Sequence, residues 1–439
     1  MAGNLVAAGL PGAAVLNGTP ETSRDPAMPD FDYLIAGAGP AGGVAARELA
    51  CLCPEASVAL VGDEAHPPYE RPPLSKGTLA QLAAGSDAPP RAMLGDREAW
   101  QVAGIHLLLG TRIASIAPQT RTVTLDDGRP LSYGKLLLAT GTRARTLPVD
   151  RGQSNLHYLR THGDACRLAM RLTAGARVVV IGGGFIGLEV AATASGLGCS
   201  VTVLEAGPRL MGRALPDVLA ERFRAKFARH GVAVRLGAAV QALEGTDAVH
   251  TVVLADGTSL PADIVVVGIG AVPNSELAQA AGLRMQDGIV TDAHGRTSDP
   301  HIYAAGDVAR RPQDLDSHPD FSARLEAWEP ALDQALATAH AMLGRPAAAV
   351  RPPWMWSDQF DWNLQIVGHG SLADTEVCRP LGDDAMAIFQ LWQGRLVGTI
   401  TLNSPREMGL ARRALQSRAQ PDPSRLADPS VPLREALGR

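Results

Sequence analysis

Residues 31–42 read Phe-Asp-Tyr-Leu-Ile-Ala-Gly-Ala-Gly-Pro-Ala-Gly, and this stretch decides the fold. An apolar run of strand character enters a G-x-G-x-x-G motif formed by Gly37, Gly39 and Gly42, and a helical pattern follows to Leu52. One glycine makes the sharp turn, the second lets the backbone approach a pyrophosphate, and the third lets the helix pack on the strand. Free N–H groups and the positive dipole at the helix start favour bound phosphates. The motif therefore indicates a dinucleotide site.

Two acidic residues follow the next predicted strand. This strand covers residues 57–61 and leads into Asp63 and Glu64, close to the ~20 residues beyond the last glycine at which the fingerprint places an acid. A carboxylate at this strand end accepts hydrogen bonds from a ribose. The segment therefore carries the turn, the helix and the acid of a nucleotide site.

Residues 177–187, Arg-Val-Val-Val-Ile-Gly-Gly-Gly-Phe-Ile-Gly, repeat this plan. A helical stretch to Ser195 and a strand over 200–204 follow, and the strand ends in Glu205. One glycine motif alone is weak evidence, because glycine-rich turns are common. Two such motifs, each between a strand and a helix and each followed by an acid, predict two dinucleotide sites.

Glu205 bears on the identity of the second nucleotide. Its carboxylate should accept a hydrogen bond from the ribose 2′-hydroxyl and repel a 2′-phosphate, so it favours NADH over NADPH. Arg209 and Arg213 lie a little downstream and could instead hold a phosphate. The strictness of the preference for NADH therefore stays open.

Each unit is closed by a small meander and a return strand. Residues 136–141 follow a tight turn at 125–128, and residues 264–270 follow the similar segment 252–257. This duplication predicts an α/β fold with two Rossmann-like dinucleotide-binding domains of the glutathione-reductase type, followed by an α+β C-terminal domain.

The composition limits the class of protein. The 439 residues suffice for two or three domains. A hydrophobic fraction of 46% and a charged fraction of 19% are ordinary for a globular protein and exclude wholesale disorder. The net charge of −5 argues against a general nucleic-acid binder. No apolar run approaches the ~20 residues of a membrane span, so no membrane contact is predicted.

The cysteines and lysines are few. The five cysteines form neither a C-x-x-C pair nor a cluster with histidine, so no metal site is predicted. Sparse thiols of odd number indicate reduced cysteines in a cytoplasmic protein. Among the 40 basic residues only Lys76, Lys135 and Lys226 are lysine. The first 30 residues have no basic start and resemble a flexible tail rather than a targeting segment.

Five motifs make the chain similar to a known family: residues 37–42 (GAGPAG), 69–76 (YERPPLSK), 182–189 (GGGFIGLE), 303–307 (YAAGD) and 354–359 (WMWSDQ). With these motifs the chain resembles the FAD-dependent ferredoxin reductases of oxygenase systems, a branch of the pyridine nucleotide–disulfide reductase fold. The resemblance runs from residue 31 to about residue 409. The second and fifth motifs are the most specific to this branch.

The fingerprints and the resemblance together assign the cofactor contacts, with FAD on the first unit and NADH on the second. FAD contacts are expected at Gly37, Gly39, Pro40, Ala41, Gly42, Asp63, Glu64, Arg71, Lys76, Ile113, Thr140, Gly141, Arg143, Gly306, Asp307, Trp328 and Trp356. NAD contacts are expected at Gly182, Gly184, Phe185, Ile186, Gly187, Glu205 and Gly270.

Lys76 and Glu189 are the catalytic residues that the resemblance implies. It places Lys76 near the flavin and pairs it with Glu189, one turn into the second nucleotide helix. A buried lysine needs such a partner, because an unpaired buried charge is costly. From the residues alone, Arg71 could equally lie in a solvated turn, Glu189 on an exposed helix face, and Trp328 in the core.

The loop at 69–76 is followed by no cysteine until Cys166. Thiol-based members of the fold carry a redox cysteine at or soon after this loop, so the resemblance implies an external electron acceptor. The implied acceptor is a [2Fe–2S] ferredoxin that supplies a ring-hydroxylating dioxygenase or a haem monooxygenase, as in aromatic hydrocarbon catabolism. Arg412 and Arg413 could attract an acidic ferredoxin, or simply lie on a solvated helix face.

Two other functions stay open. A flavin-dependent NADH reductase of a small molecule, of the monodehydroascorbate type, can share the 69–76 motif, although the segment 354–359 weighs against it. A non-enzymatic flavoprotein that senses NADH is the second, and the compact length and the lack of a targeting segment count against it. The sequence does not indicate an oligomeric state.

The predicted domain limits follow from the two nucleotide units and the tryptophan-rich end. They are a flexible tail at 1–30, the first part of the FAD-binding domain at 31–148, the NAD-binding domain at 149–271, the second part of the FAD-binding domain at 272–350, and an α+β C-terminal domain with a disordered end at 351–439.

Overall fold

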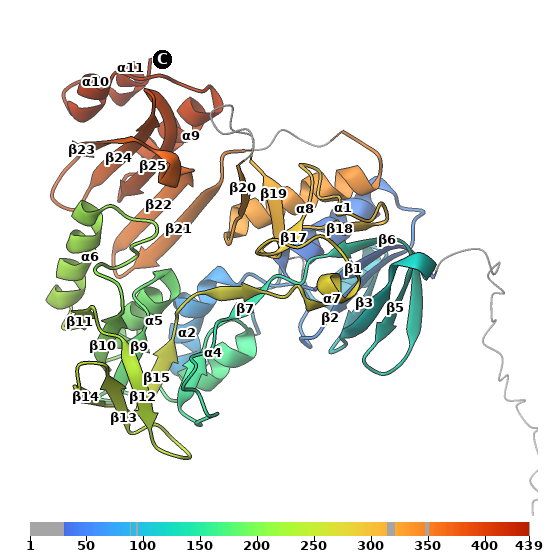
Figure 1. Ribbon diagram of the computed structural model, residues 1–439, viewed down its shortest axis with the longest axis horizontal. Helices are drawn as coiled ribbons and strands as arrows, with labels where there is room; N and C mark the ends of the chain where they lie inside the picture. The colour runs from blue at the N-terminus through green and yellow to red at the C-terminus, as the bar shows by residue number, and fades with distance from the viewer. Residues whose placement is uncertain (1–29, 88, 94, 314–320, 347–350, 439) are drawn as a thin grey trace, which may run out of the picture.

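The computed structural model describes residues 30–87, 89–93, 95–313, 321–346 and 351–438 (Figure 1). The predicted tail, apart from Asp30, lies outside the described residues. The described chain forms three main sheets with helices packed on them, in agreement with the predicted α/β class.

The first sheet carries the first glycine motif. Its elements are β1 (Phe31–Ala36), α1 (Pro40–Leu52), β2 (Val58–Gly62), β3 (Ile105–Leu109), β4 (Ile113–Ala117), β5 (Thr122–Leu125), β6 (Pro130–Leu138), β18 (Ile302–Ala304) and α8 (Trp328–Met342). Strands β3, β2, β1, β6 and β18 run parallel, and the β4–β5 meander pairs antiparallel with the start of β6. Since β18 and α8 come much later in the chain than β6, two separate segments build this sheet layer.

The second sheet carries the second glycine motif. Its elements are β8 (Leu156–Tyr158), β9 (Arg177–Ile181), α5 (Phe185–Gly196), β10 (Ser200–Glu205), α6 (Asp217–Arg229), β11 (Ala233–Leu236) and β15 (Ile264–Val267). The strands are all parallel, in the order β11-β10-β9-β15-β8. The carboxyl ends of parallel strands share one edge, so the glycine turn after β9 and the acid that ends β10 come together there.

The third sheet is antiparallel and lies in the C-terminal part of the chain. Its strands are β21 (Trp354–Gln359), β22 (Trp362–Gly368), β23 (Thr375–Pro380), β24 (Met386–Trp392) and β25 (Arg395–Leu402), with α9 (Pro405–Gln416) packed on the sheet. The strand order is β21-β22-β25-β24-β23. Figure 1 shows β21 extending toward α5.

Short elements connect these layers. The chain passes from the first sheet to the second through β7 (Thr142–Ala144) and returns through β16 (Ala271–Pro273), and these two strands pair antiparallel. The others are α2 (Gly77–Ala83), α3 (Arg97–Val102), α4 (His162–Ala169), the meander β12 (Val240–Glu244), β13 (Thr251–Leu254) and β14 (Ser259–Pro261), then α7 (Glu276–Ala280), β17 (Ile289–Val290), β19 (Ala309–Pro312) and β20 (Ser322–Arg324).

The prediction of a disordered end is wrong. Two short helices, α10 (Pro423–Ala427) and α11 (Leu433–Ala436), follow α9 and bury Leu426, Leu433 and Leu437 against the third sheet. Prolines and serines are frequent in this segment, but the leucines between them provide enough apolar surface to hold it. The segment therefore belongs to the folded C-terminal part.

One continuous hydrophobic core joins the second and third sheets. It includes Phe223 and Phe227 of α6 together with Trp362 and Leu364 of β22. The rings of Phe223 and Trp362 meet edge to face with centroids 5.1 Å apart, a favourable aromatic geometry. The third sheet is therefore fixed against the second by packing. Within the described residues, no helix combines the length and the apolarity that a membrane crossing requires.

Candidate active site

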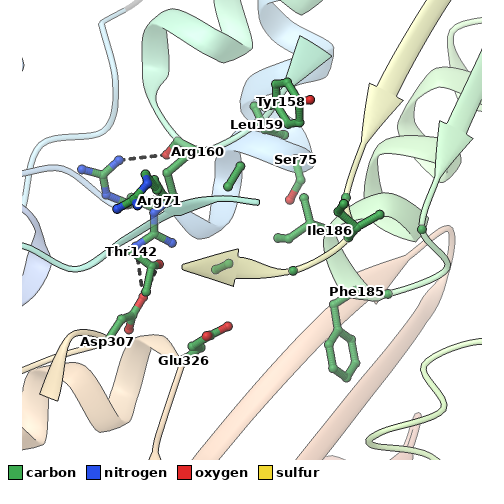
Figure 2. Close-up of a pocket in the computed structure, with 18 of the residues that line it drawn as sticks. Arg71, Ser75, Thr142, Tyr158, Leu159, Arg160, Phe185, Ile186, Asp307 and Glu326 are labelled. Atoms are coloured by element: carbon green, nitrogen blue, oxygen red, sulfur yellow. Dashed lines mark hydrogen bonds and ion pairs between the residues drawn. The ribbon is translucent and has the colours of Figure 1, made fainter. Parts of the chain in front are cut away.

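A cavity of about 1370 Å³ lies where the first sheet, the second sheet and β21 meet (Figure 2). Both glycine turns open into it, the first through Gly37 and Gly39 and the second through Gly182 and Gly184. The space is therefore shared by the two predicted nucleotide sites.

The first glycine turn has no room for a side chain. Gly37 has φ +116°, and a Cβ there would lie 2.2 Å from the carbonyl oxygen of Ala139. A Cβ on Gly42 would lie 1.9 Å from the carbonyl oxygen of Gly37. Gly39 is the N-cap residue of α1 and provides no side-chain cap. The turn therefore leaves the helix start accessible to an anion.

The second glycine turn has the same geometry. Gly182 has φ +111°, and its hypothetical Cβ would lie 2.4 Å from the carbonyl oxygen of Gly268. A Cβ on Gly187 would lie 2.1 Å from the carbonyl oxygen of Gly182. Gly184 begins α5, again without a side-chain cap. Gly42 and Gly187 do not line the cavity, and their place behind it matches the close-packing role of the third glycine.

Glu205 is already oriented by the backbone. Its two carboxylate oxygens accept hydrogen bonds from the N–H groups of Gly183 and Gly207, each at 2.7 Å. Of the two alternative phosphate ligands, Arg209 forms an ion pair with Asp217 at 2.6 Å, and Arg213 lines the cavity. The carboxylate thus lies at the cavity edge beside the glycine turn, where a ribose would be placed.

Glu64 and Arg71 form an ion pair of 2.7 Å beneath the first glycine turn. The hydroxyl of Tyr69 donates to Glu64 at 2.6 Å, and burial raises the pKa of this phenol, so Tyr69 remains a donor at neutral pH. Asp63 pairs with Arg112 at 3.3 Å. Arg71 is half-buried and paired, so it does not lie in a solvated turn, the alternative that the sequence left open.

Arg160 links the segment that carries Arg71 to the segment that carries Asp307. Its guanidinium forms an ion pair of 3.0 Å with Asp307, and its carbonyl oxygen accepts a hydrogen bond of 2.8 Å from Arg71. The hydroxyl of Thr142 donates to Asp307 at 3.4 Å. Figure 2 shows Arg71, Arg160 and Asp307 converging from three different segments. The sequence reasoning missed Arg160, because no local motif marks the loop between β8 and α4.

Three tryptophans, Trp328, Trp354 and Trp356, cluster beside the cavity. Trp328 opens α8 and meets Trp356 of β21 edge to face, with centroids 6.1 Å apart. Trp354 stacks on Trp356 at 5.2 Å. Among the described residues, the buried indole nitrogen of Trp328 has no hydrogen-bond partner, and Trp328 lines the cavity. An unsatisfied buried donor at this place favours a polar ligand group opposite it.

Lys76 and Glu189 meet as the resemblance implied. The ammonium nitrogen lies 2.9 Å from the carboxylate, and Glu189 is only 3% exposed. The reading of Glu189 as an exposed helix residue is therefore wrong. The hydroxyls of Ser75 and Ser357 also donate to this carboxylate. Neither serine was singled out from the sequence.

Most predicted site residues line this one cavity, from the FAD set Gly37, Gly39, Pro40, Ala41, Asp63, Glu64, Arg71, Lys76, Thr140, Gly141, Arg143, Gly306, Asp307, Trp328 and Trp356, and from the NAD set Gly182, Gly184, Phe185, Ile186, Glu205 and Gly270. Ile113 does not. Ile113 begins β4, and its side chain packs against the core cluster that includes Leu34 and Val123, so its contact with FAD stays a prediction.

Arg412 is also less available than a docking residue would be. Its guanidinium binds Glu329 of α8 at 2.8 Å and lies over the ring of Trp354 at 5.1 Å. This arginine therefore ties α9 to α8.

The residues present fit FAD and a nicotinamide nucleotide. Two turns without room for a Cβ, two uncapped helix starts and an oriented acid meet the steric and electrostatic needs of two pyrophosphates and a ribose. All five cysteines are free thiols. In the described ranges no cluster of histidine, cysteine and acidic residues is suited to a metal ion.

Comparison with known proteins adds to this geometry. Residues 31–335 match the pyridine nucleotide-disulphide oxidoreductase family, and residues 354–437 match the reductase C-terminal family. The ferredoxin–NAD(+) reductase component of the anthranilate 1,2-dioxygenase system of Burkholderia cepacia is 41% identical, over 92% of this chain and 99% of that protein. Putidaredoxin reductase of Pseudomonas putida is 39% identical, over 92% of this chain and 96% of that protein.

Solved structures are similar along the whole described fold. The covalent putidaredoxin reductase–putidaredoxin complex matches with a TM-score of 0.88 and 37% identity, over 94% of this chain and 99% of that chain. The ferredoxin reductase of the CYP199A2 system from Rhodopseudomonas palustris matches with a TM-score of 0.85 and 37% identity, over 92% and 99%.

Proposed function

The chain belongs to the pyridine nucleotide-disulphide oxidoreductase family, and on this premise we propose that it is an NADH-dependent ferredoxin reductase. It oxidises NADH and passes the electrons through FAD to a [2Fe–2S] ferredoxin. That ferredoxin supplies an oxygenase, either a ring-hydroxylating dioxygenase or a haem monooxygenase. The named relatives serve systems of this kind.

One observation carries the proposal: both nucleotide turns open into one cavity, and none of the described residues that line it is cysteine. A member of the family that stores electrons in a disulfide needs a thiol beside the flavin. Here the electrons have no such acceptor in the chain, so they leave to another molecule.

The chain's own residues bind and orient the two nucleotides. When bound, FAD accepts a hydride from NADH and releases two electrons one at a time. The start of α1, Arg71 and Asp307 hold FAD, while the start of α5 and Glu205 hold NADH. Lys76 lines the cavity, where its positive charge would stabilise negative charge on a reduced flavin. The start of α8 has no side-chain cap and lines the cavity through Ala327 and Trp328, so it would add positive dipole there.

The domain limits follow the sheets. Segments 31–148 and 272–350 form the FAD-binding domain, 149–271 the NAD-binding domain, and 351–439 the C-terminal domain. The parallel pairing of β18 with β6 supports the split of the first domain. Free thiols support a cytoplasmic setting.

The decisive experiment measures NADH-driven reduction of cytochrome c with and without an added [2Fe–2S] ferredoxin. A ferredoxin reductase gives a large stimulation by ferredoxin that saturates at micromolar carrier. A reductase of small molecules gives no stimulation but reduces a quinone or the monodehydroascorbate radical directly. An NADH-sensing flavoprotein oxidises NADH slowly with every acceptor.

A further inference from the structure

The Glu189 carboxylate is a meeting point of all three parts of the fold. Glu189 lies in α5 of the second sheet layer, whereas Ser75 ends the short 3-10 helix Pro72–Ser75 and Lys76 links it to α2. Ser357 lies in β21 of the C-terminal sheet, with its side chain fully buried, and donates to Glu189 at 2.6 Å. One carboxylate of α5 therefore receives hydrogen bonds from two other segments, 75–76 and β21, that are distant from it and from each other in the sequence.

The hydrogen bond from Ser357 has a fixed direction. The side-chain amide of Gln359 donates to the Ser357 oxygen at 3.0 Å, so that oxygen is already an acceptor. A hydroxyl has one hydrogen, and the carboxylate of Glu189 is an acceptor only. The hydrogen of Ser357 therefore points at Glu189.

The ammonium of Lys76 is oriented in turn. Two of its three donors are used, one by Glu189 at 2.9 Å and one by the carbonyl oxygen of Pro72 at 3.2 Å. The third donor remains for the cavity, which Lys76 lines. The direction of this donor depends on where the Glu189 carboxylate is held.

The position of Ser357 is rigid. The β21 strand that carries it packs on α5, and the turn after β21 is joined to α6 by the ion pair of Lys226 and Asp361 at 2.5 Å. The shared hydrophobic core of the second and third sheets lies directly behind this contact. The C-terminal sheet thus presents its hydroxyl from a packed surface rather than from a loop.

We propose that Ser357, together with Ser75, is a positioning residue for the reaction: the C-terminal domain holds the Glu189 carboxylate so that Lys76 is aimed at the bound flavin. This inference rests on the proposed function, since it assigns these serines to the same reaction. The C-terminal domain then completes the hydride-accepting site and is more than a surface for a partner.

The test compares Ser357→Ala with Ser404→Ala. Ser404 is equally buried in the C-terminal part and donates to the carbonyl oxygen of Leu402, far along the chain from the cavity residues. Ser357→Ala is expected to slow flavin reduction at saturating NADH about tenfold, the effect of losing one hydrogen bond to a charged group. FAD content and NADH affinity stay at the wild-type level. Equal rates in the two variants would overturn the proposal.

A second readout does not need NADH. Chemical reduction of the FAD-loaded protein gives the midpoint potential, which should become more negative by about 30 mV in Ser357→Ala, the two-electron equivalent of a tenfold change. An unchanged potential in this variant contradicts the proposal, even if its turnover is slow. Wild-type protein that fails to reduce ferredoxin refutes the proposed acceptor alone, because the potential still decides the role of Ser357.

A double-mutant cycle shows whether the hydroxyls act through Glu189. In the Glu189→Gln background, Ser357→Ala and Ser75→Ala should change the reduction rate by less than about twofold and the potential by less than the equivalent ~9 mV, because the carboxylate they hold is gone. Full additivity of the effects would show that the serines act elsewhere and would refute the assignment.

Discussion

Lys226 of α6 and Asp361 of the turn between β21 and β22 form an ion pair of 2.5 Å in which the lysine is 6% exposed and the aspartate lies mostly in solvent. The ammonium also lies 5.1 Å from the ring centroid of Trp362. This pair joins the NAD-binding and C-terminal parts of the fold, next to the core that they share.

Asp361→Asn should lower the free energy of unfolding by about 1–3 kcal/mol at pH 7, because it leaves a buried ammonium without its charged partner. The hydrogen bond from Lys226 lowers the pKa of Asp361 in the folded state. Because the pKa is lower in the folded state, the ionised carboxylate stabilises the fold above the unfolded-state pKa of about 4. This contribution is lost as the pH falls through the folded-state pKa. The difference between wild type and variant in urea unfolding should therefore shrink as the pH falls below about 4. Glu221→Gln, in an exposed pair on the same helix, should change stability by less than about 0.5 kcal/mol.

Gly37→Ala and Gly182→Ala should separate the two nucleotide sites. Each variant places a methyl group against a carbonyl oxygen at a positive φ, so each turn must distort. Gly37→Ala is expected to purify with little FAD, measured by the flavin absorbance per chain. Gly182→Ala should keep FAD but raise the KM for NADH at least tenfold. Gly257→Ala has a positive φ and open space around it, and it should retain both properties. Loss of FAD from Gly182→Ala would contradict the assignment.

Glu205→Arg should shift the nucleotide preference. The change removes the acceptor for the ribose hydroxyls and places a positive charge where a 2′-phosphate would bind. The ratio of kcat/KM for NADH to that for NADPH should fall by about a hundredfold or more, measured by steady-state kinetics with ferricyanide as acceptor. An unchanged ratio would show that the ribose does not reach this carboxylate.

Arg379→Met should loosen the C-terminal helices. The Arg379 guanidinium is 3% exposed and donates to the carbonyl oxygens of Leu426, Asp428 and Val431 at 3.0, 2.8 and 2.6 Å. Its loss leaves these acceptors without a donor and should cost about 2–4 kcal/mol of local stability. Hydrogen exchange of residues 423–437 should accelerate, with FAD content unchanged. Exchange as slow as in the wild type would mean that leucine packing alone holds the segment.

The glycine turns could be predicted from sequence because their requirements are local. A positive φ and a carbonyl oxygen within 2.4 Å of a hypothetical Cβ restrict both Gly37 and Gly182 to glycine. The strand before each turn and the acid after it follow within one supersecondary unit. The predicted fold class and family are confirmed for the same reason.

Other features depend on distant parts of the chain and leave no local pattern. Arg160 reaches Asp307 only because β8 lies beside β15 in the second sheet, and Ser357 reaches Glu189 only because β21 packs on α5. The sequence did not predict α10 and α11, because both helices are short and a proline stands at the start of each, Pro423 and Pro432. The FAD contact at Ile113 stays a prediction, because the sequence alone does not show that its side chain packs against the core of the first sheet.

The ammonium groups of all three lysines of the chain are bound to acceptors within the protein. Lys76 binds Glu189, Lys226 binds Asp361, and Lys135 donates to the carbonyl oxygen of Met342 at the end of α8. Positive charge on the exposed surface is therefore carried by guanidinium groups, which amine-reactive reagents do not modify. Carbodiimide coupling of lysines to ferredoxin carboxylates should capture little complex with this reductase, whereas arginine-directed dicarbonyl reagents should block association.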